Sequence, residues 1–189
     1  MGFDNIISFR RASLTDTELL FKWANDPETR KNSFHSEPIS HEEHVRWFQK
    51  KLDSPATLIL IASLGETPNS SAEGTSSMVT DLATFTHPHA TPIDVGLLRL
   101  KKEDNRLMIS YSVAPDLRGR GLGYLLLRDG LLYEKEKRLL SAVLTHPVFC
   151  AEVKPANTAS AKIFMKLGFT LTKSTDTALH FVLPLSALT

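Results

Sequence analysis

Cysteine, long apolar runs and an excess of charge of either sign are all scarce in this sequence. The single cysteine, Cys150, cannot form an internal disulfide, and a lone thiol is typical of a reducing cytoplasm rather than of a secretory route. No apolar run approaches the roughly 20 residues that span a bilayer. The N-terminus also lacks the apolar stretch after a basic region that marks a signal peptide. We therefore expect a cytoplasmic protein that does not enter a membrane.

The near balance of charges argues against a nucleic-acid partner. The 22 basic residues offset 21 acidic ones and leave a formal net charge of +1, so the chain has no broad attraction for a polyanion. Its 42% hydrophobic and 23% charged residues are close to globular averages, and 189 residues suffice to bury most of a domain's apolar surface. We predict one domain over residues 1–189, with any anion site confined to a local feature.

The spacing of apolar residues and of turn formers predicts alternating strands and helices. Four helices are expected: one opened by a capping box of Thr15 and Glu18 and ended at the Asn-Asp-Pro of 25–27, one opened by a capping box of Ser40 and Glu43, one after the glycines of 119–123, and one from Asn157 or Thr158 to Gly168. The expected strands span 6–11, 57–63, 95–102, 106–114, 148–153, 169–173 and 178–185, with Glu-Asp-Asn closing a hairpin between the third and the fourth.

The resulting order, β-α-α-β-β-β-α-β-α-β-β, indicates an α/β fold in which helices cover a mixed sheet. Residues 65–93 are rich in Ser, Thr, Pro and Gly. This composition predicts an extended loop insert that is longer than ordinary connections, with one candidate strand near 79–85.

The stretch Val-Ala-Pro-Asp-Leu-Arg-Gly-Arg-Gly-Leu-Gly at 113–123 places glycines and two arginines between an expected strand and an expected helix. The first turn of a helix carries unpaired N–H groups and about half a positive charge, so it binds phosphate well. The stretch lacks the last glycine of a dinucleotide fingerprint and the Gly-Lys-Ser/Thr of a nucleoside-triphosphate loop. It indicates a different phosphate site, the alternative being a glycine turn with solvated arginines.

Two motifs together resemble those of the GNAT superfamily of N-acetyltransferases. One is Arg118-x-x-Gly121-x-Gly123, and the other spans 151–169, with Asn157 at a helix start and Leu-Gly-Phe at its close. The resemblance implies a mostly antiparallel sheet of six or seven strands flanked by about four helices, with acetyl-CoA as co-substrate. It also implies that a bulge before the loop presents an amide to the thioester carbonyl. The residues it assigns to the coenzyme are Val113, Arg118, Gly119, Arg120, Gly121, Leu122, Gly123 and Asn157.

The resemblance also suggests which groups move protons. Glu152 occupies the position of a general base in some branches of the family. Phe164 stands where several relatives have a tyrosine that protonates the departing thiolate, and phenylalanine has no proton to give. That proton must then come from water, from Tyr111 or from Ser112. In the segment expected to border the acceptor, His35 or Glu37 could accept the amine proton, directly or through water. Glu152, and the loop that carries His35 and Glu37, could instead be merely solvated.

The acceptor is expected to be a small-molecule amine. Trp23-x-Asn25-Asp26-Pro-Glu-x-Arg30 and the following Ile-Ser and Glu-His pairs resemble the branch that acetylates 4-amino sugars of UDP-linked nucleotides. Arg30 is the candidate partner of a nucleotide phosphate, or else a surface arginine. The same segment also resembles the branch that acetylates N-termini of ribosomal proteins. A catalytically silent acyl-CoA-binding module and an RNA-binding loop are further alternatives, and the oligomeric state is open, a homodimer included.

No metal is expected to take part. His41-Glu-Glu-His44 has helical spacing, but it is not the His-Glu-x-x-His of metalloproteases and no third ligand is evident nearby. The aromatic residues Trp23, Trp47 and Phe48 recur at helical spacing among other apolar residues, which predicts core packing for all three.

Overall fold

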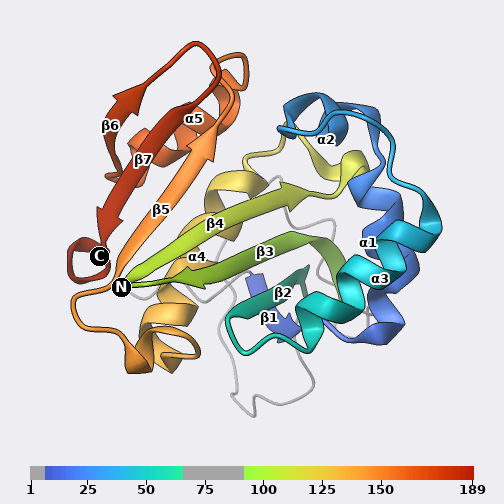
Figure 1. The fold of residues 1–189 in the computed structure, drawn as a ribbon, viewed down its shortest axis with the longest axis horizontal. Coiled ribbons are helices and arrows are strands. Elements are labelled where there is room, and N and C mark those ends of the chain that lie inside the picture. The colour runs from blue at the N-terminus through green and yellow to red at the C-terminus, as the bar shows by residue number, and fades with distance from the viewer. Residues whose placement is uncertain (1–6, 66–91) are drawn as a thin grey trace, which may run out of the picture.

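The computed structural model describes residues 7–65 and 92–189. Nearly all of the expected loop insert, with its candidate strand near 79–85, lies outside the described residues. Within the described residues, seven strands form one sheet in the order β1-β2-β3-β4-β5-β7-β6, antiparallel throughout except between β4 and β5 (Figure 1). The strands are β1 Ile7–Arg11, β2 Thr57–Leu64, β3 Ile93–Glu103, β4 Arg106–Val113, β5 Val148–Val153, β6 Thr170–Ser174 and β7 Leu179–Pro184. The expected mixed, mostly antiparallel α/β fold is confirmed.

Five α-helices are described rather than about four: α1 Thr17–Ala24, α2 Pro27–Asn32, α3 His41–Leu52, α4 Leu122–Lys137 and α5 Thr158–Lys166. The prediction missed α2. Pro27 does follow the end of α1, but it is also the first residue of α2, where proline's missing N–H costs nothing. Asp26 caps that helix by accepting a hydrogen bond from the N–H of Thr29 (2.9 Å).

Of the two expected capping boxes, one is confirmed and one is displaced. Ser40 and Glu43 exchange the predicted hydrogen bonds at the start of α3. The box expected at Thr15 and Glu18 is wrong, because the reciprocal pair is Ser13 with Asp16, ahead of a short 3₁₀ turn.

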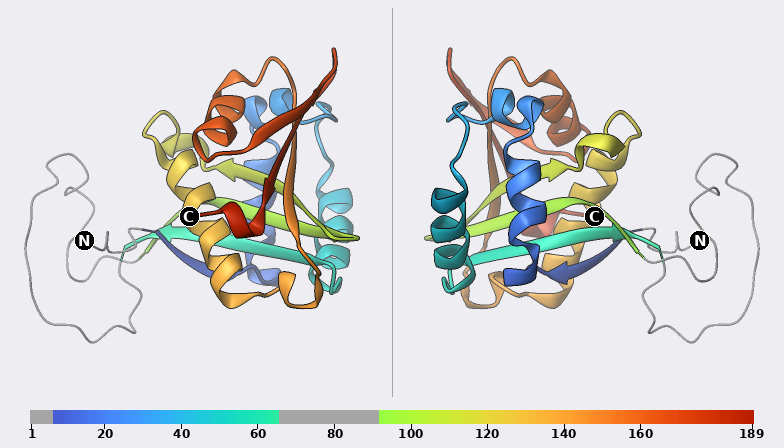
Figure 2. Two further views of the ribbon diagram at one scale, coloured as in Figure 1. Left: turned by 90° about the vertical axis from the view of Figure 1, so that its left-hand side faces the viewer. Right: turned by 90° about the vertical axis from the view of Figure 1, so that its right-hand side faces the viewer.

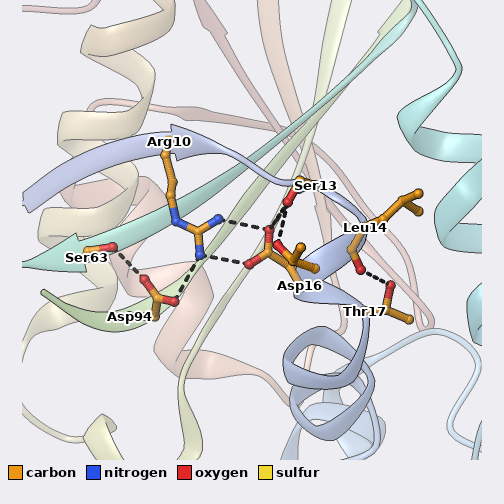
Figure 3. Close-up of polar contacts among 8 residues, drawn as sticks. Arg10, Ser13, Leu14, Asp16, Thr17, Ser63 and Asp94 are labelled. Carbon is orange, nitrogen blue, oxygen red and sulfur yellow. Dashed lines mark hydrogen bonds and ion pairs between the residues drawn. The ribbon is translucent and has the colours of Figure 1, made fainter. Parts of the chain in front are cut away.

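The displacement has a visible reason, since Asp16 also joins the helix start to the sheet (Figure 3). Its carboxylate accepts two hydrogen bonds from the Arg10 guanidinium, at 2.8 and 2.9 Å. Arg10 reaches Asp94 as well (3.1 Å), and Asp94 accepts from Ser63 (2.6 Å). Burial alone would raise the pKa of Asp16, but the bonds from Arg10 and Ser13 lower it. The network ties β1, β2 and β3 to the segment that leads into α1.

Helices cover both faces of the sheet (Figure 2). On one face α1 and α3 pack through a core that includes Leu20, Trp23 and Phe48 against Ile59 and Ile61. On the other face α4 and α5 cover a larger core built from alternate residues of the central strands. The predicted core role is confirmed for Trp23 and Phe48, at 4% and 0% exposure, but it is wrong for Trp47, which is 37% exposed.

Candidate active site

The parallel strands β4 and β5 pair only at one end. Arg106–Ile109 of β4 lie opposite Val148–Ala151 of β5, after which the strands separate, β5 leading toward α5 and β4 toward α2 (Figure 1). Strand β4 continues to Val113, and beyond Ile109 the described residues give it a strand partner on its β3 side alone. A gap therefore opens in the middle of the sheet.

Two backbone donors of β4 face this gap. The Ala114 N–H donates to Val95 O on the β3 side (2.8 Å), and hydrogen-bonded positions alternate along an antiparallel ladder. By this alternation the N–H of Ser112 points to β3, and the N–H groups of Val113 and Tyr111 point into the gap. The bulge expected in β4 is wrong, because its register with β3 is unbroken and the sheet's shift here lies between β2 and β3. The alternation along the strand directs the amide of Val113 into the gap without a bulge.

A cleft of about 1380 Å³ follows the gap between the strands. Of the sequence-predicted site residues, only Arg120 is not among those that line it. The predicted residues that the structure brings to the cleft are Arg30, His35, Glu37, Tyr111, Ser112, Val113, Arg118, Gly119, Gly121, Leu122, Gly123, Glu152 and Asn157.

The loop before α4 leaves its backbone open to the cleft. Gly119 and Gly121 both have φ +77°, which favours glycine, and a Cβ built on either would meet no heavy atom within 4 Å. Gly121 is the N-cap of α4 and has no side chain to satisfy the first N–H groups of the helix. A Cβ on Gly123 would instead lie 3.1 Å from Ile163, so this glycine permits close packing of α4 on α5. The first two glycines thus leave donors free for an anion.

Arg118 does not simply project its charge from this loop. Its guanidinium lies 2.6 Å from the carboxylate of Asp26 and donates to the Thr29 hydroxyl (2.7 Å). Burial tends to raise the pKa of Asp26, but the bonds from Arg118 and Thr29 lower it. Arg118, which the sequence predicts to contact phosphate, therefore bridges the glycine loop to Asp26 and α2.

Tyr111 and Ser112 lie on opposite faces of β4, as strand alternation requires. The Tyr111 hydroxyl lies 3.0 Å from that of Ser160 on α5, and its ring meets Phe164 edge-on at 6.0 Å. Burial raises the pKa of Tyr111, and the hydrogen bond with Ser160 only partly offsets this effect. Phe164 itself is 2% exposed and belongs to the core. Tyr111 thus brings a phenol that stays protonated to the cleft.

Asn157 caps α5, as the sequence predicts, by accepting from the N–H of Ser160 (3.1 Å). Glu152 extends from β5 on the other side of the gap, half-exposed, with its carboxylate 3.4 Å from Nδ1 of His180 on β7. A helix cap and a cleft carboxylate are both present at the positions where the second motif places them.

The segment between α1 and α3 forms another wall of the cleft. The Asn25 side chain ties it down through two hydrogen bonds of 2.8 Å with the backbone of Ile39. His35 and Glu37 are exposed on this wall. Arg30 is partly buried, and its partners among the described residues are neutral oxygens, the carbonyl of His35 (3.2 Å) and the hydroxyl of Ser33 (3.1 Å). Burial lowers the pKa of Arg30.

Sequence reasoning missed Arg99 and Trp47, which also line the cleft. Arg99 is part of an otherwise apolar stretch of β3, and a basic residue inside a buried strand was the available signal. The residues that the structure describes contain no group of three His, Cys, Asp or Glu side chains arranged to hold a metal. None of the helices described is both long and apolar enough for a membrane span.

The sequence and the fold both resemble those of known proteins. The model of the acetyltransferase (GNAT) domain matches residues 7–170, whereas a search of curated protein sequences gives no match. Among solved structures, spermidine N-acetyltransferase from Vibrio cholerae in complex with CoA and spermine is similar with a TM-score of 0.71 and 14% identity, over 97% of this chain and 98% of that one. A domain from Methanocaldococcus jannaschii is similar with a TM-score of 0.70 and 19% identity, over 96% of this chain and 99% of that one. AAC(6')-Ib in complex with ribostamycin and coenzyme A is similar with a TM-score of 0.67 and 14% identity, over 96% of this chain and 94% of that one. At these identities the likeness to solved structures shows the fold.

Proposed function

The chain belongs to the GNAT acetyltransferase family and uses acetyl-CoA as its co-substrate, and we propose that it acetylates the primary amine of an amino-sugar nucleotide. The observation that carries the donor half is the meeting of two open donor sets in one cleft: the loop amides before α4 and the gap-facing amides of β4. The acceptor half is supported by Arg30, a partly buried cation on the cleft wall whose described partners are neutral oxygens.

Acetyl-CoA supplies an acetyl thioester, whose carbon a neutral amine can attack directly. We assign its pyrophosphate to the loop amides around Gly121, at the start of a helix. The N–H of Val113 faces the gap and is our candidate donor to the oxygen that becomes negative during the attack. A donor fixed in a strand needs no reorganisation when that charge develops, so it favours the transition state.

Two proton transfers accompany the acetyl transfer. Tyr111 keeps its proton at neutral pH and can give it to the departing thiolate. It would thus replace the tyrosine that several relatives have at the position of Phe164. The amine proton can pass to Glu152, His35 or Glu37, directly or through water, since all three line the cleft. An amine with a pKa near 8 needs less than about 1 kcal/mol to deprotonate at pH 7.4, whereas a lysine-like amine needs about 4. Sugar amines fall in the easier class, so positioning suffices for much of the rate.

The test is a thiol-release assay with acetyl-CoA and a panel of amines: a UDP-4-amino sugar, a peptide with a free N-terminus, spermidine and ribostamycin. Release with the UDP-4-amino sugar at the highest kcat/KM supports the proposal. Highest activity on the peptide would instead favour protein N-termini as the acceptor. Binding of acetyl-CoA with no release from any amine would make the chain a silent coenzyme-binding module.

The donor site has a separate test, in which melting temperature is measured with and without acetyl-CoA. Ligand at 100 times its dissociation constant adds about 2.7 kcal/mol of stability. Gly121→Glu should lose this stabilisation, because it places a negative side chain where the phosphates belong. Gly121→Ala carries the same backbone strain without that charge and serves as the control. Full stabilisation of the Glu variant by acetyl-CoA would remove the loop from the site.

A further inference from the structure

Arg99 is fixed in the cleft by two neighbours on different elements. It lies on β3 opposite Ser110 of β4, whose hydroxyl accepts a hydrogen bond from the guanidinium (2.9 Å). On its other side the guanidinium lies 5.3 Å from the ring centre of Trp47 on α3. Both contacts orient the cation, and neither neutralises it.

The charges near Arg99 that the structure describes include that of Lys51. Among the residues that the structure describes, no carboxylate lies within ion-pair distance of it. Burial lowers the pKa of Arg99. Burial also lowers the pKa of Lys51, as do the nearby charges of Arg99 and Lys101.

Other arginines of the same domain show what a paired environment looks like. Arg10 contacts the carboxylate of Asp16 and Arg128 that of Asp129, and in both cases hydrogen bonding to the aspartate raises the arginine pKa. Arg99 has no such partner within the described part of the chain, although desolvation of a cation is costly unless a counter-charge or hydrogen bonds offset it.

A guanidinium that is held in place, partly desolvated and directed into a cleft is suited to a carboxylate or a phosphate, which its planar fork binds through two parallel hydrogen bonds. The position also fits the acceptor rather than the coenzyme phosphates. Arg99 is opposite Ser110, one residue before Tyr111, whereas the glycine loop follows the far end of β4.

We propose, building on the function proposed above, that Arg99 binds an anionic group of the acceptor and makes this enzyme select amines that also carry a carboxylate or a phosphate. Arg30, which also lines the cleft and whose described partners are neutral oxygens, adds to the same preference. A polycationic amine would gain nothing from Arg99, because like charges repel; any activity on it would rely on the cleft carboxylates Glu28, Glu37, Glu43 and Glu152.

The experiment compares amines that differ only in an anion. Glucosamine 6-phosphate against glucosamine probes phosphate, and alanyl-alanine against its C-terminal amide probes carboxylate, with spermidine as the polycation. We expect kcat/KM to be about 10- to 100-fold higher for the anionic member of at least one pair, which is the range of a charge-assisted hydrogen bond. The phosphate and carboxylate arms identify which anion is used.

Arg99→Gln should abolish that preference mainly through KM, and Arg99→Lys should retain part of it. Arg106→Gln, an exposed arginine at the start of β4 that does not line the cleft, is the control and should leave the preference unchanged. Melting temperature with acetyl-CoA shows whether each variant is folded and retains its donor site. If both Arg99 variants fail to fold, the wild-type preference within the matched pairs decides the question alone.

Absence of any wild-type preference, or a preference that Arg99→Gln leaves intact, would overturn the inference while the acetyltransferase remains active. If no amine releases thiol, the proposed function fails. The affinities of the matched amines, measured by calorimetry in the presence of CoA, then decide the role of Arg99 by the same comparison.

Discussion

Breaking the bridge between Asp26 and Arg118 should weaken both the fold and the hold on acetyl-CoA. The carboxylate of Asp26 caps α2 through Thr29 and at the same time lies 2.6 Å from the guanidinium of Arg118. Asp26→Ala removes a cap worth about 1 kcal/mol and a charge-assisted hydrogen bond worth about 1.5–3 kcal/mol. The Arg118 side chain is 30% exposed, so solvent screening favours the lower end. We expect a loss of about 2–3 kcal/mol, or roughly 5–10 °C in Tm for a chain of this size.

Two milder variants separate the cap from the charge. Asp26→Asn keeps a good N-cap but loses the negative charge, and Arg118→Gln removes only the cation. A double-mutant cycle between them, measured by urea unfolding, should give a coupling of about 1 kcal/mol. Because the bridge anchors the glycine loop, both variants should raise KM for acetyl-CoA more than they change kcat.

The outcome that refutes this reasoning is a coupling near zero together with an unchanged KM for acetyl-CoA. The bridge would then be a surface ion pair without consequence, and Arg118 would be free to turn toward the phosphates. A fall in affinity for Arg118→Gln alone, with Asp26→Asn unaffected, would likewise assign Arg118 to the coenzyme directly.

Three further predictions test separate parts of the site and fold. Tyr111→Phe should lower kcat about 100-fold or more, the usual contribution of a general acid, with little change in acetyl-CoA affinity by thermal shift; an unchanged kcat would assign the proton to water. Gly96→Ala should cost about 1–3 kcal/mol or more in urea unfolding, because the new Cβ would lie 2.3 Å from the backbone oxygen of Ser112; wild-type stability would mean that the strands separate freely. The lowered pKa of Asp16 adds stability that is complete above its unfolded value of about 3.9 and is lost as pH falls through the lower folded value, so Asp16→Asn should flatten the acid limb of the unfolding free energy.

Local chemistry made much of the fold predictable from sequence. The Ser40 and Glu43 box, the hairpin between β3 and β4 and the cap at Asn157 all follow from neighbours within a few residues. The missed helix α2 was also within reach. An Asp-Pro-Glu run is typical of a helix start as much as of a helix end, so the same three residues also predict α2.

The parts that could not be predicted depend on contacts between distant residues. Asp26 and Arg118 are 92 positions apart, and Tyr111 and Ser160 are 49 apart. Nothing in either local sequence indicates the pairing, because the tertiary fold alone brings those segments together. The same applies to Arg99: the pattern marks a strand, but only the packed structure shows that its charge has no described counterpart.

The two amides of the gap show how one local rule nevertheless determines the site. Along β4, side-chain direction and N–H direction alternate with the same period of two residues. Tyr111 and Val113 pack their side chains toward the α4 and α5 face, and the same alternation turns their N–H groups toward the missing β5 partner. A slip of one residue would move the phenol to the opposite face and direct the amides of Ser110 and Ser112 into the gap instead. The apolar pattern that fixes the register of β4 therefore also fixes which amides face the gap and which hydroxyl is brought to the cleft.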